Sequence, residues 1–164
     1  MTKTCKELFE GLDCTIIGNE NEPIEGIAYR SDSVKPHDAF CCIVGLKSDG
    51  HSYAQDAIDR GARVLVVERK IYLADATDVT EVVVSDSRKA MAHLAAHFYD
   101  CPSNDFSLVG ITGTNGKTTS TYLVEHIASV LGKRTGIIGT VGITIAGKTK
   151  KSSRTTPESP DLQH

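Results

Sequence analysis

The stretch of the chain best suited to chemistry runs from residue 110 to residue 119 and reads Gly-Ile-Thr-Gly-Thr-Asn-Gly-Lys-Thr-Thr. Glycines can adopt backbone angles closed to other residues, so the N–H groups around positions 113 and 116 can turn inward around a phosphate. Lys117 offers an ammonium group that neutralises phosphate charge, and Thr118 offers a hydroxyl that can bind Mg²⁺. We therefore predict a nucleotide phosphate loop made by Gly113, Thr114, Asn115, Gly116, Lys117, Thr118 and Thr119.

The segments on either side supply the setting that such a loop requires. The apolar run 106–111 predicts a short buried strand before the loop, and residues 117–131 predict a helix after it. The strict G-x-x-x-x-G-K-[ST] spacing would place its first glycine at Ile111, whereas this chain has Gly110 and Gly113. An ordinary surface turn is the alternative interpretation. Whether Thr119 contacts a nucleotide or only begins the helix stays open.

Composition narrows the class of protein. The chain has 164 residues, of which 40% are hydrophobic and 24% charged, as is typical of a soluble globular protein. A formal net charge of -3 with dispersed Lys and Arg predicts no nucleic-acid-binding face. No apolar run reaches the roughly 18 residues of a membrane span, and no secretory segment follows Met1, so we expect a cytoplasmic protein without membrane partners. The odd number of cysteines, 5, with no C-x-x-C pair, favours free thiols.

The first hundred residues alternate between strand and helix patterns. Strands are expected at 24–29, 40–44, 64–67 and 81–84, and helices at 3–12, 53–60 and 86–99. Such strand, helix, strand units favour an α/β fold with a parallel or mixed sheet and ligands at the strand ends. Cys101-Pro102-Ser103-Asn104 interrupts all periodicity, which predicts a domain boundary between 1–103 and 104–164.

Two histidines stand one turn apart on the predicted helix 86–99. The spacing of His93 and His97 can bind a metal ion, but no Glu follows His93 and no third ligand is evident. We therefore interpret both as residues on the flank of the helix.

Three motifs resemble the Mur ligases. The string GxTGTNGKTT is similar to the ATP loop of Mur ligases and of folylpolyglutamate synthetases. Residues 29–62 contain Tyr-x-Ser, Val-x-Pro-x-Asp-x-Phe, Gly-x-x-x-Asp-Gly-His and Ala-Ile-x-x-Gly-Ala in the order of the N-terminal domain of tripeptide-forming Mur ligases, which folylpolyglutamate synthetases lack. Thr-Thr-Pro-Glu at 155–158, followed by Leu-Gln, is similar to the same branch.

The resemblance implies substrate-binding roles. Tyr29 and Ser31 match positions that face uracil and phosphate, Leu46, Lys47 and Ser48 match a loop that meets the nucleotide through its backbone, and Thr155 and Thr156 match threonines that orient the sugar-peptide end. Departures leave alternatives open. The family often reads Asp-Ser-Arg around Ser31 and Gly at His37, a one-residue shift would give the role to Ser33, and Tyr29 could be a core residue. Thr156 could equally cap a helix that begins at Pro157.

The resemblance also implies an activity. It predicts an ATP- and Mg²⁺-dependent ligase that adds a diamino acid, L-lysine or meso-diaminopimelate, to UDP-N-acetylmuramoyl-L-alanyl-D-glutamate, with Lys117 as catalytic residue and Thr118 as metal ligand. It covers about the first third of a typical member, so we expect a small N-terminal α/β domain for the UDP substrate, followed by the start of an incomplete P-loop ATPase domain. The alternative is a binding module without turnover. A small nucleotide kinase would need an arginine-rich lid, which is not visible.

Overall fold

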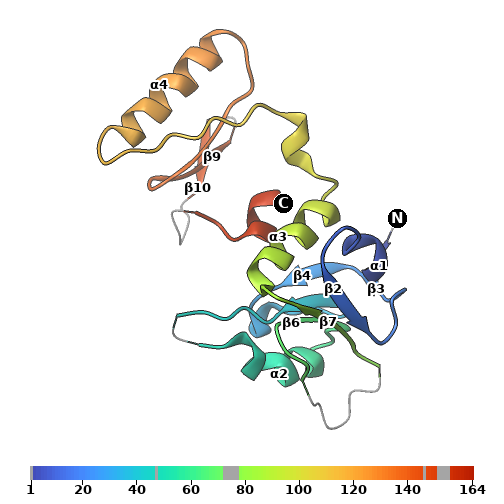
Figure 1. Cartoon of the computed structure of the whole chain (residues 1–164). Helices are drawn as coiled ribbons and strands as arrows, with labels where there is room; N and C mark the ends of the chain where they lie inside the picture. The colour runs from blue at the N-terminus through green and yellow to red at the C-terminus, as the bar shows by residue number, and fades with distance from the viewer. Residues whose placement is uncertain (1, 47, 72–77, 146, 151–155) are drawn as a thin grey trace. The chain divides into compact units, whose positions relative to one another are not determined.

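The computed structural model describes residues 2–46, 48–71, 78–145, 147–150 and 156–164, and the chain divides into two compact units (Figure 1). Unit 1 comprises Met1–Pro102 with Gln163–His164, and unit 2 comprises Ser103–Leu162.

Unit 1 is built on a five-stranded mixed sheet in the order β2-β7-β6-β5-β4. Four strands are parallel, and β2 pairs antiparallel with β7 at one edge. A separate short pair joins β1 to β3. The mixed α/β sheet predicted from the sequence is therefore confirmed. The strands are β1 Lys3–Thr4, β2 Cys14–Ile17, β3 Pro23–Ile24, β4 Gly26–Ala28, β5 Asp38–Cys41, β6 Val64–Val67 and β7 Thr80–Val84.

The helices of unit 1 begin and end at recognisable signals. Helix α1 is shorter than the predicted 3–12 helix: it begins after Thr4, which forms a capping box with Glu7, and ends at Leu8. Asp86 caps α3 by accepting hydrogen bonds from the first-turn N–H groups. Gly61, at φ 106°, follows the end of α2. The helical segments are α1 Cys5–Leu8, η1 Ser31–Ser33, η2 Gly50–Tyr53, α2 Ala54–Asp59 and α3 Ser87–Phe98.

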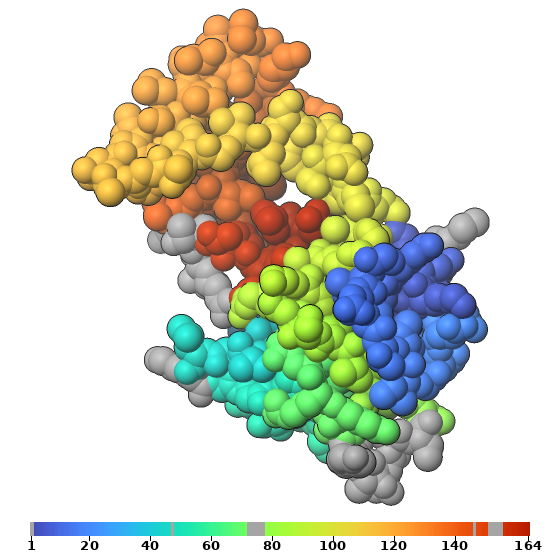
Figure 2. Space-filling model, viewed as in Figure 1, coloured from blue at the N-terminus to red at the C-terminus, as the bar shows by residue number. Residues whose placement is uncertain are grey.

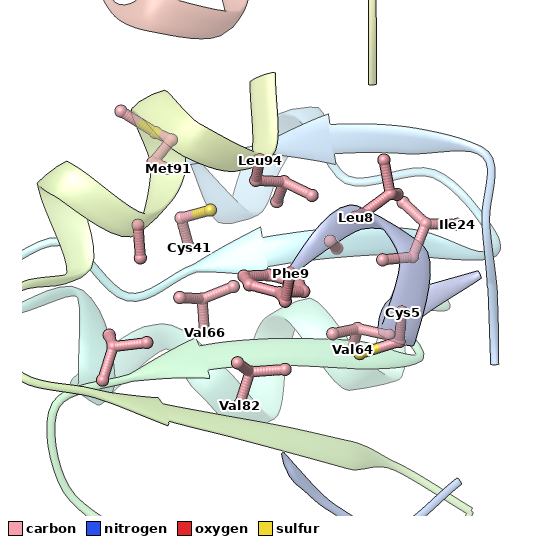
Figure 3. Packing of buried hydrophobic residues seen from close by; sticks show 13 residues of the cluster. Cys5, Leu8, Phe9, Ile24, Cys41, Val64, Val66, Val82, Met91 and Leu94 are labelled. Carbon is pink, nitrogen blue, oxygen red and sulfur yellow. The ribbon is translucent and has the colours of Figure 1, made fainter. Parts of the chain in front are cut away.

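The buried strands have apolar side chains on both faces, as parallel strands require. On one face Val64 and Val66 pack with Met91 and Leu94 of α3 and with residues of α1, and Figure 3 shows this cluster. On the other face Leu65 and its neighbours pack against α2. Alternation along β5 and β6 thus supplies two core layers, and burying each large aliphatic side chain contributes roughly 1.5–3 kcal/mol.

Unit 2 combines one long helix with a small antiparallel sheet in the order β10-β9-β8. Helix α4, Lys117–Val130, lies close to β8, and the Thr135 hydroxyl donates to Glu125 Oε1 of the helix at 2.7 Å. Strands β9 and β10 pair antiparallel after the helix. The other elements are η3 Pro102–Asp105, β8 Gly136–Gly139, β9 Gly142–Ile145, β10 Lys148–Lys150 and α5 Ser159–Gln163.

The strand predicted at 106–111 is wrong. In the described part of the chain these residues pair with no strand, and the side chains of Phe106, Leu108 and Val109 are exposed. A strand exists through hydrogen bonds to a neighbour, which an apolar run cannot supply by itself.

The apolar stripe of α4 is also uncovered. None of the residues of α4 is buried, and its surface is visible in Figure 2. The exposed large apolar side chains of α4 are Tyr122, Leu123, Val124, Ile127 and Val130.

Within the described ranges, no helix combines the length and apolar character needed to cross a bilayer.

Candidate functional site

The phosphate loop of unit 2 has the backbone shape that its glycines predict. Gly116 takes the left-handed conformation, at φ 77°, immediately before α4, and Gly113 has φ 144°. A Cβ on Gly116 would meet no atom within 4 Å, so the requirement for glycine here is conformational and not steric.

The N-terminus of α4 carries no side-chain cap. Its first-turn N–H groups have no intrahelical acceptor, and the aligned peptide dipoles of this 14-residue helix add partial positive charge there. An uncapped helix N-terminus that follows a glycine turn can hold an anion.

Lys117 places its ammonium group over this loop. Its Nζ donates to the carbonyl oxygen of Gly113 and, at 3.2 Å, to that of Thr114. Thr118 and Thr119 are exposed in the first turn of the helix. The structure thus brings the predicted loop residues together as one exposed, cationic turn. These residues fit a nucleotide phosphate and its Mg²⁺ ion.

Unit 1 has a second candidate site at the carboxyl ends of its parallel strands. The segment after β5, residues 43–50, is called the edge loop here, and its Lys47 lies outside the described residues. Val44 and Asp49 form an isolated bridge, and Gly45 N donates to Ser48 O at 2.9 Å, which closes the loop on itself. Leu46 is fully exposed at its tip.

Gly50 allows this loop to fold. A Cβ at this position would lie 2.6 Å from Ile43 N and 2.8 Å from Cys42 C, both backbone atoms. Gly50 N also donates to Ile43 O at 2.9 Å. Glycine is therefore required by close packing of the backbone.

A hydrogen-bond network centred on the buried His51 joins the edge loop to the end of β6. His51 Nδ1 lies 2.5 Å from Asp49 Oδ1, and His51 Nε2 accepts from Glu68 N at 2.9 Å. Arg69 Nη2 donates to the other oxygen of Asp49 at 2.7 Å. The Arg69 guanidinium, with the backbone and ring N–H groups of His51, holds the pKa of Asp49 well below its usual range.

The network extends to the start of α3, which follows β7. Glu68 Oε1 accepts from the N–H of Ser87 at 2.9 Å and from its hydroxyl at 2.8 Å. Ser87 is the first residue of α3 and is buried. Loops after three neighbouring strands are thus tied together at one edge of the sheet, where ligands of open α/β sheets commonly bind.

The predicted substrate residues Tyr29 and Ser31, in the segment after β4, lie at the same edge of the sheet. Tyr29 follows β4, is half-buried and packs against the core, which agrees with the core alternative and leaves the uracil role a prediction. Ser31 begins η1, and its side chain hydrogen-bonds the Asp56 carboxylate, which lowers the pKa of Asp56. Ser33 donates to Arg30 O at 2.8 Å, so its hydroxyl serves the local turn.

The third motif is only partly described. Lys47 and Thr155 lie outside the described residues. Thr156 is exposed and does not cap a helix, because α5 begins at Ser159 and contains Pro160 in its first turn. The predicted helix start at Pro157 is therefore wrong.

The remaining reactive side chains are accounted for by packing. Burial raises the pKa of the Cys5 and Cys42 thiols to about 12, and both are free. The rings of His93 and His97 lie 4.0 Å apart, and His93 Nε2 lies 3.0 Å from Glu10 O. Among the described residues no group of three or more potential ligands could hold a metal ion.

Comparison with known proteins finds family matches for both parts of the chain, the part with the edge loop and the part with the phosphate loop. Residues 23–99 match the family described as "Mur ligase family, catalytic domain", and residues 111–164 match the "Mur ligase middle domain". The chain belongs to the Mur ligase family.

Two curated Mur ligases illustrate the similarity. The UDP-N-acetylmuramoyl-L-alanyl-D-glutamate--2,6-diaminopimelate ligase of Clostridium perfringens is 40% identical over 158 residues, which are 96% of this chain and 32% of that protein. The ligase of the same name from Halalkalibacterium halodurans is 47% identical over 148 residues, 90% of this chain and 30% of that protein. The chain thus spans about a third of the length of the curated relatives it matches.

A solved Mur ligase structure supports the fold. The structure of a UDP-N-acetylmuramoyl-L-alanyl-D-glutamate--2,6-diaminopimelate ligase matches with a TM-score of 0.72 and 23% identity, covering 99% of this chain and 32% of that one.

The sequence alone did not reveal how the Mur ligase motif Gly-x-x-x-Asp-Gly-His works. The resemblance predicts substrate contacts in this loop for Leu46, Lys47 and Ser48, whereas the structure shows Asp49, His51 and the later Arg69 in one network. The adjacent Asp-Gly-His triplet is the signal in the sequence. Its partners Glu68 and Arg69 come 17 and 20 residues later and carry no motif.

Proposed function

We propose that this chain forms the UDP-substrate-binding part and the phosphate-loop part of an ATP-dependent amide ligase. The ligase adds a diamino acid to the D-glutamate of UDP-N-acetylmuramoyl-L-alanyl-D-glutamate. The observation that carries the proposal is the combination of an uncapped helix behind a left-handed glycine with 40% identity to a ligase of that name across 96% of the chain.

The chemistry explains why a phosphate loop is needed. A carboxylate is a poor electrophile because its leaving group would be oxide, and ATP supplies the phosphoryl group that converts it to an acyl phosphate that an amine can attack. The task of the protein is to position the groups and to neutralise charge.

Each loop residue has a part in that task. The N–H groups of residues 113–116 and of the first turn of α4 bind phosphate oxygens, and Lys117 neutralises the charge that develops during transfer. The Thr118 hydroxyl is the ligand for Mg²⁺. Thr155 and Thr156 orient the acceptor, as the resemblance implies.

The edge loop and the segment after β4 have the other role. We assign the uridine diphosphate end of the substrate to Tyr29, Ser31 and the edge loop, since open α/β sheets bind ligands beyond the carboxyl ends of their strands. The cytoplasm is the proposed location, where nucleotide-activated precursors and ATP are available.

A second candidate function is a binding module without turnover. The chain spans only 32% of the length of the Clostridium perfringens ligase, and the apolar stripe of α4 is uncovered in the described part of the chain. Such a module would bind both nucleotides without joining their reacting ends.

Calorimetry and a phosphate-release assay separate the two. We expect the chain to bind UDP-N-acetylmuramoyl-L-alanyl-D-glutamate, with phosphate release only in a full-length ligase that carries this sequence. Release by the 164-residue chain itself, dependent on the diamino acid, would exclude the module. Failure to bind either nucleotide would contradict both functions.

A further inference from the structure

We propose that His51 is a positioning residue, which holds the edge loop in the shape that binds the uridine diphosphate end of the substrate. The identity of the ligand rests on the proposed function. The role of His51 itself is inferred from the hydrogen bonds that its ring makes in the structure.

The imidazole of His51 connects two separate pieces of backbone. Its Nε2 accepts from Glu68 N at 2.9 Å, so the ring proton must be on Nδ1, which points at Asp49 Oδ1 from 2.5 Å. The side chain is only 4% exposed, which shields both hydrogen bonds from water. One neutral ring therefore serves as acceptor toward β6 and donor toward the edge loop.

The two contacts together fix the loop. Asp49 forms the bridge to Val44 that closes the loop and also receives the N–H of His51 at 3.0 Å. Its second oxygen is held by Arg69. If the ring were lost, Asp49 would keep the backbone N–H of residue 51 and the exposed Arg69 but lose the ring donor, and Glu68 N would lose its acceptor inside the fold.

The exposed part of the loop is what a ligand would meet. Leu46 stands in solvent at the tip, and the carbonyl of Ser48 is occupied by the Gly45 N–H. A loop that meets its ligand largely through backbone groups depends on a fixed shape, because backbone groups cannot reorient by rotamer changes. Ordering such a loop only on binding would reduce affinity.

Two conservative variants separate the two contacts. In His51→Asn the amide nitrogen can replace Nδ1 as donor to Asp49, but nothing reaches Glu68 N. In His51→Gln the amide oxygen can replace Nε2 as acceptor from Glu68 N, but the donor to Asp49 is lost. His51→Ala removes both.

Titration calorimetry of the full chain with UDP-N-acetylmuramoyl-L-alanyl-D-glutamate tests the proposal. We expect His51→Ala to weaken binding about tenfold or more, and Asn and Gln to give intermediate losses of about threefold. Binding of a non-hydrolysable ATP analogue should stay within about twofold, since the phosphate loop shares none of these contacts. Unchanged substrate affinity in His51→Ala would overturn the proposal.

A stability control distinguishes positioning from general loosening. Val64→Ala opens a cavity at the start of β6, where Val64 is fully buried. We expect it to lower the unfolding midpoint at least as much as His51→Ala while leaving substrate affinity within about twofold. An equal loss of affinity in both variants would overturn the positioning role.

Amide exchange gives a readout that needs no ligand. We expect His51→Ala, but not Val64→Ala, to speed exchange at the Gly45 and Gly50 amides, both hydrogen-bonded within the loop. Unchanged exchange would show that His51 does not shape the loop. If exchange changes but the wild-type chain binds no UDP substrate, the proposed function fails and with it the ligand assigned to the loop.

Discussion

The edge loop of unit 1 and the phosphate loop of unit 2 are stabilised in opposite ways. In the edge loop, Glu68 N bonds His51 across 17 residues and Arg69 bonds Asp49 across 20. In the phosphate loop, Lys117 bonds carbonyls only 4 and 3 residues before it. One loop takes its shape from distant partners, and the other from its own glycines and the helix that follows.

This difference explains what each loop tolerates. A locally determined loop keeps its shape wherever a helix can begin, so its residues are chosen for chemistry. A loop held by distant partners loses its shape when one contact is removed, so its residues are chosen for packing as well as for binding.

The largest effect is expected at the phosphate loop. Lys117→Ala in a full-length ligase that carries this sequence should lower turnover by at least about 100-fold, because the charge that stabilises phosphoryl transfer is lost. Its unfolding midpoint should stay nearly unchanged, since the side chain bonds only the loop's own carbonyls. Phosphate release and thermal melting measure the two.

Lys133→Ala is the matched control, because it removes an exposed ammonium just after the other end of α4. Near-normal turnover in Lys117→Ala, or an equal loss in Lys133→Ala, would contradict the role of Lys117.

The opposite behaviour is expected of the edge loop. Gly50→Ala should destabilise the chain by about 1–3 kcal/mol, because the new Cβ meets only backbone atoms, which cannot move aside. Urea unfolding of the full chain measures it. Gly110→Ala should stay within about 0.5 kcal/mol, since a Cβ there meets nothing within 4 Å. An equal loss of stability in both variants would contradict the steric requirement for glycine at position 50.

Two carboxylates of unit 1 should give opposite pH dependences. The pKa of Asp49 is lowered, so its contribution to stability is present above about pH 4, the range of an unfolded Asp, and is lost as the pH falls. Burial raises the pKa of Asp38, so its ionised form destabilises the fold, increasingly as the pH rises above about 4.

Urea midpoints between pH 3 and pH 7 would show this. We expect Asp49→Asn to lower the stability at pH 7. The loss of stability on acidification should also be smaller in this variant than in the wild type. Asp38→Asn should keep an acceptor for Lys35 N and raise stability relative to wild type toward pH 7. Shifts of the same sign in both variants would contradict these assignments.

The smallest effect is expected at His37, where the sequence departs from the family pattern. His37 has φ 63°, a conformation that glycine adopts freely, and its N–H donates to Gly61 O at 2.9 Å. His37→Gly should stabilise the chain by about 0.5–1 kcal/mol, measured by urea unfolding. Lys35→Gly, at a residue with negative φ, should destabilise instead. A destabilised His37→Gly would indicate a role for the imidazole.

Local signals were the ones that the sequence revealed. The run Val64–Val67 was predicted with the bounds it has as β6, because four consecutive apolar residues with both faces buried leave little ambiguity. The start of α4 followed from Gly116 and Lys117. Both depend on residues close together in the chain.

Non-local features were missed or misjudged. The antiparallel strand β2 was not predicted, since Cys14–Ile17 becomes a strand only by pairing with residues 81–84. The run 106–111 was predicted as a strand but has no partner in the described part of the chain. The network around His51 was not predicted, because Glu68 and Arg69 look like ordinary surface charges in the sequence. Only the pairing of β5 with β6 brings them to the edge loop.

The pairing of β2 has a consequence for how unit 1 is made. Cys14 lies opposite Val84, and Lys3 forms an ion pair with Asp100 at 2.5 Å, so residues near the beginning of the 1–102 segment find their partners near its end. During translation, residues 3–17 cannot form these contacts until residues 81–100 have left the ribosome. Nascent chains arrested before that point should remain open to protease near the amino terminus.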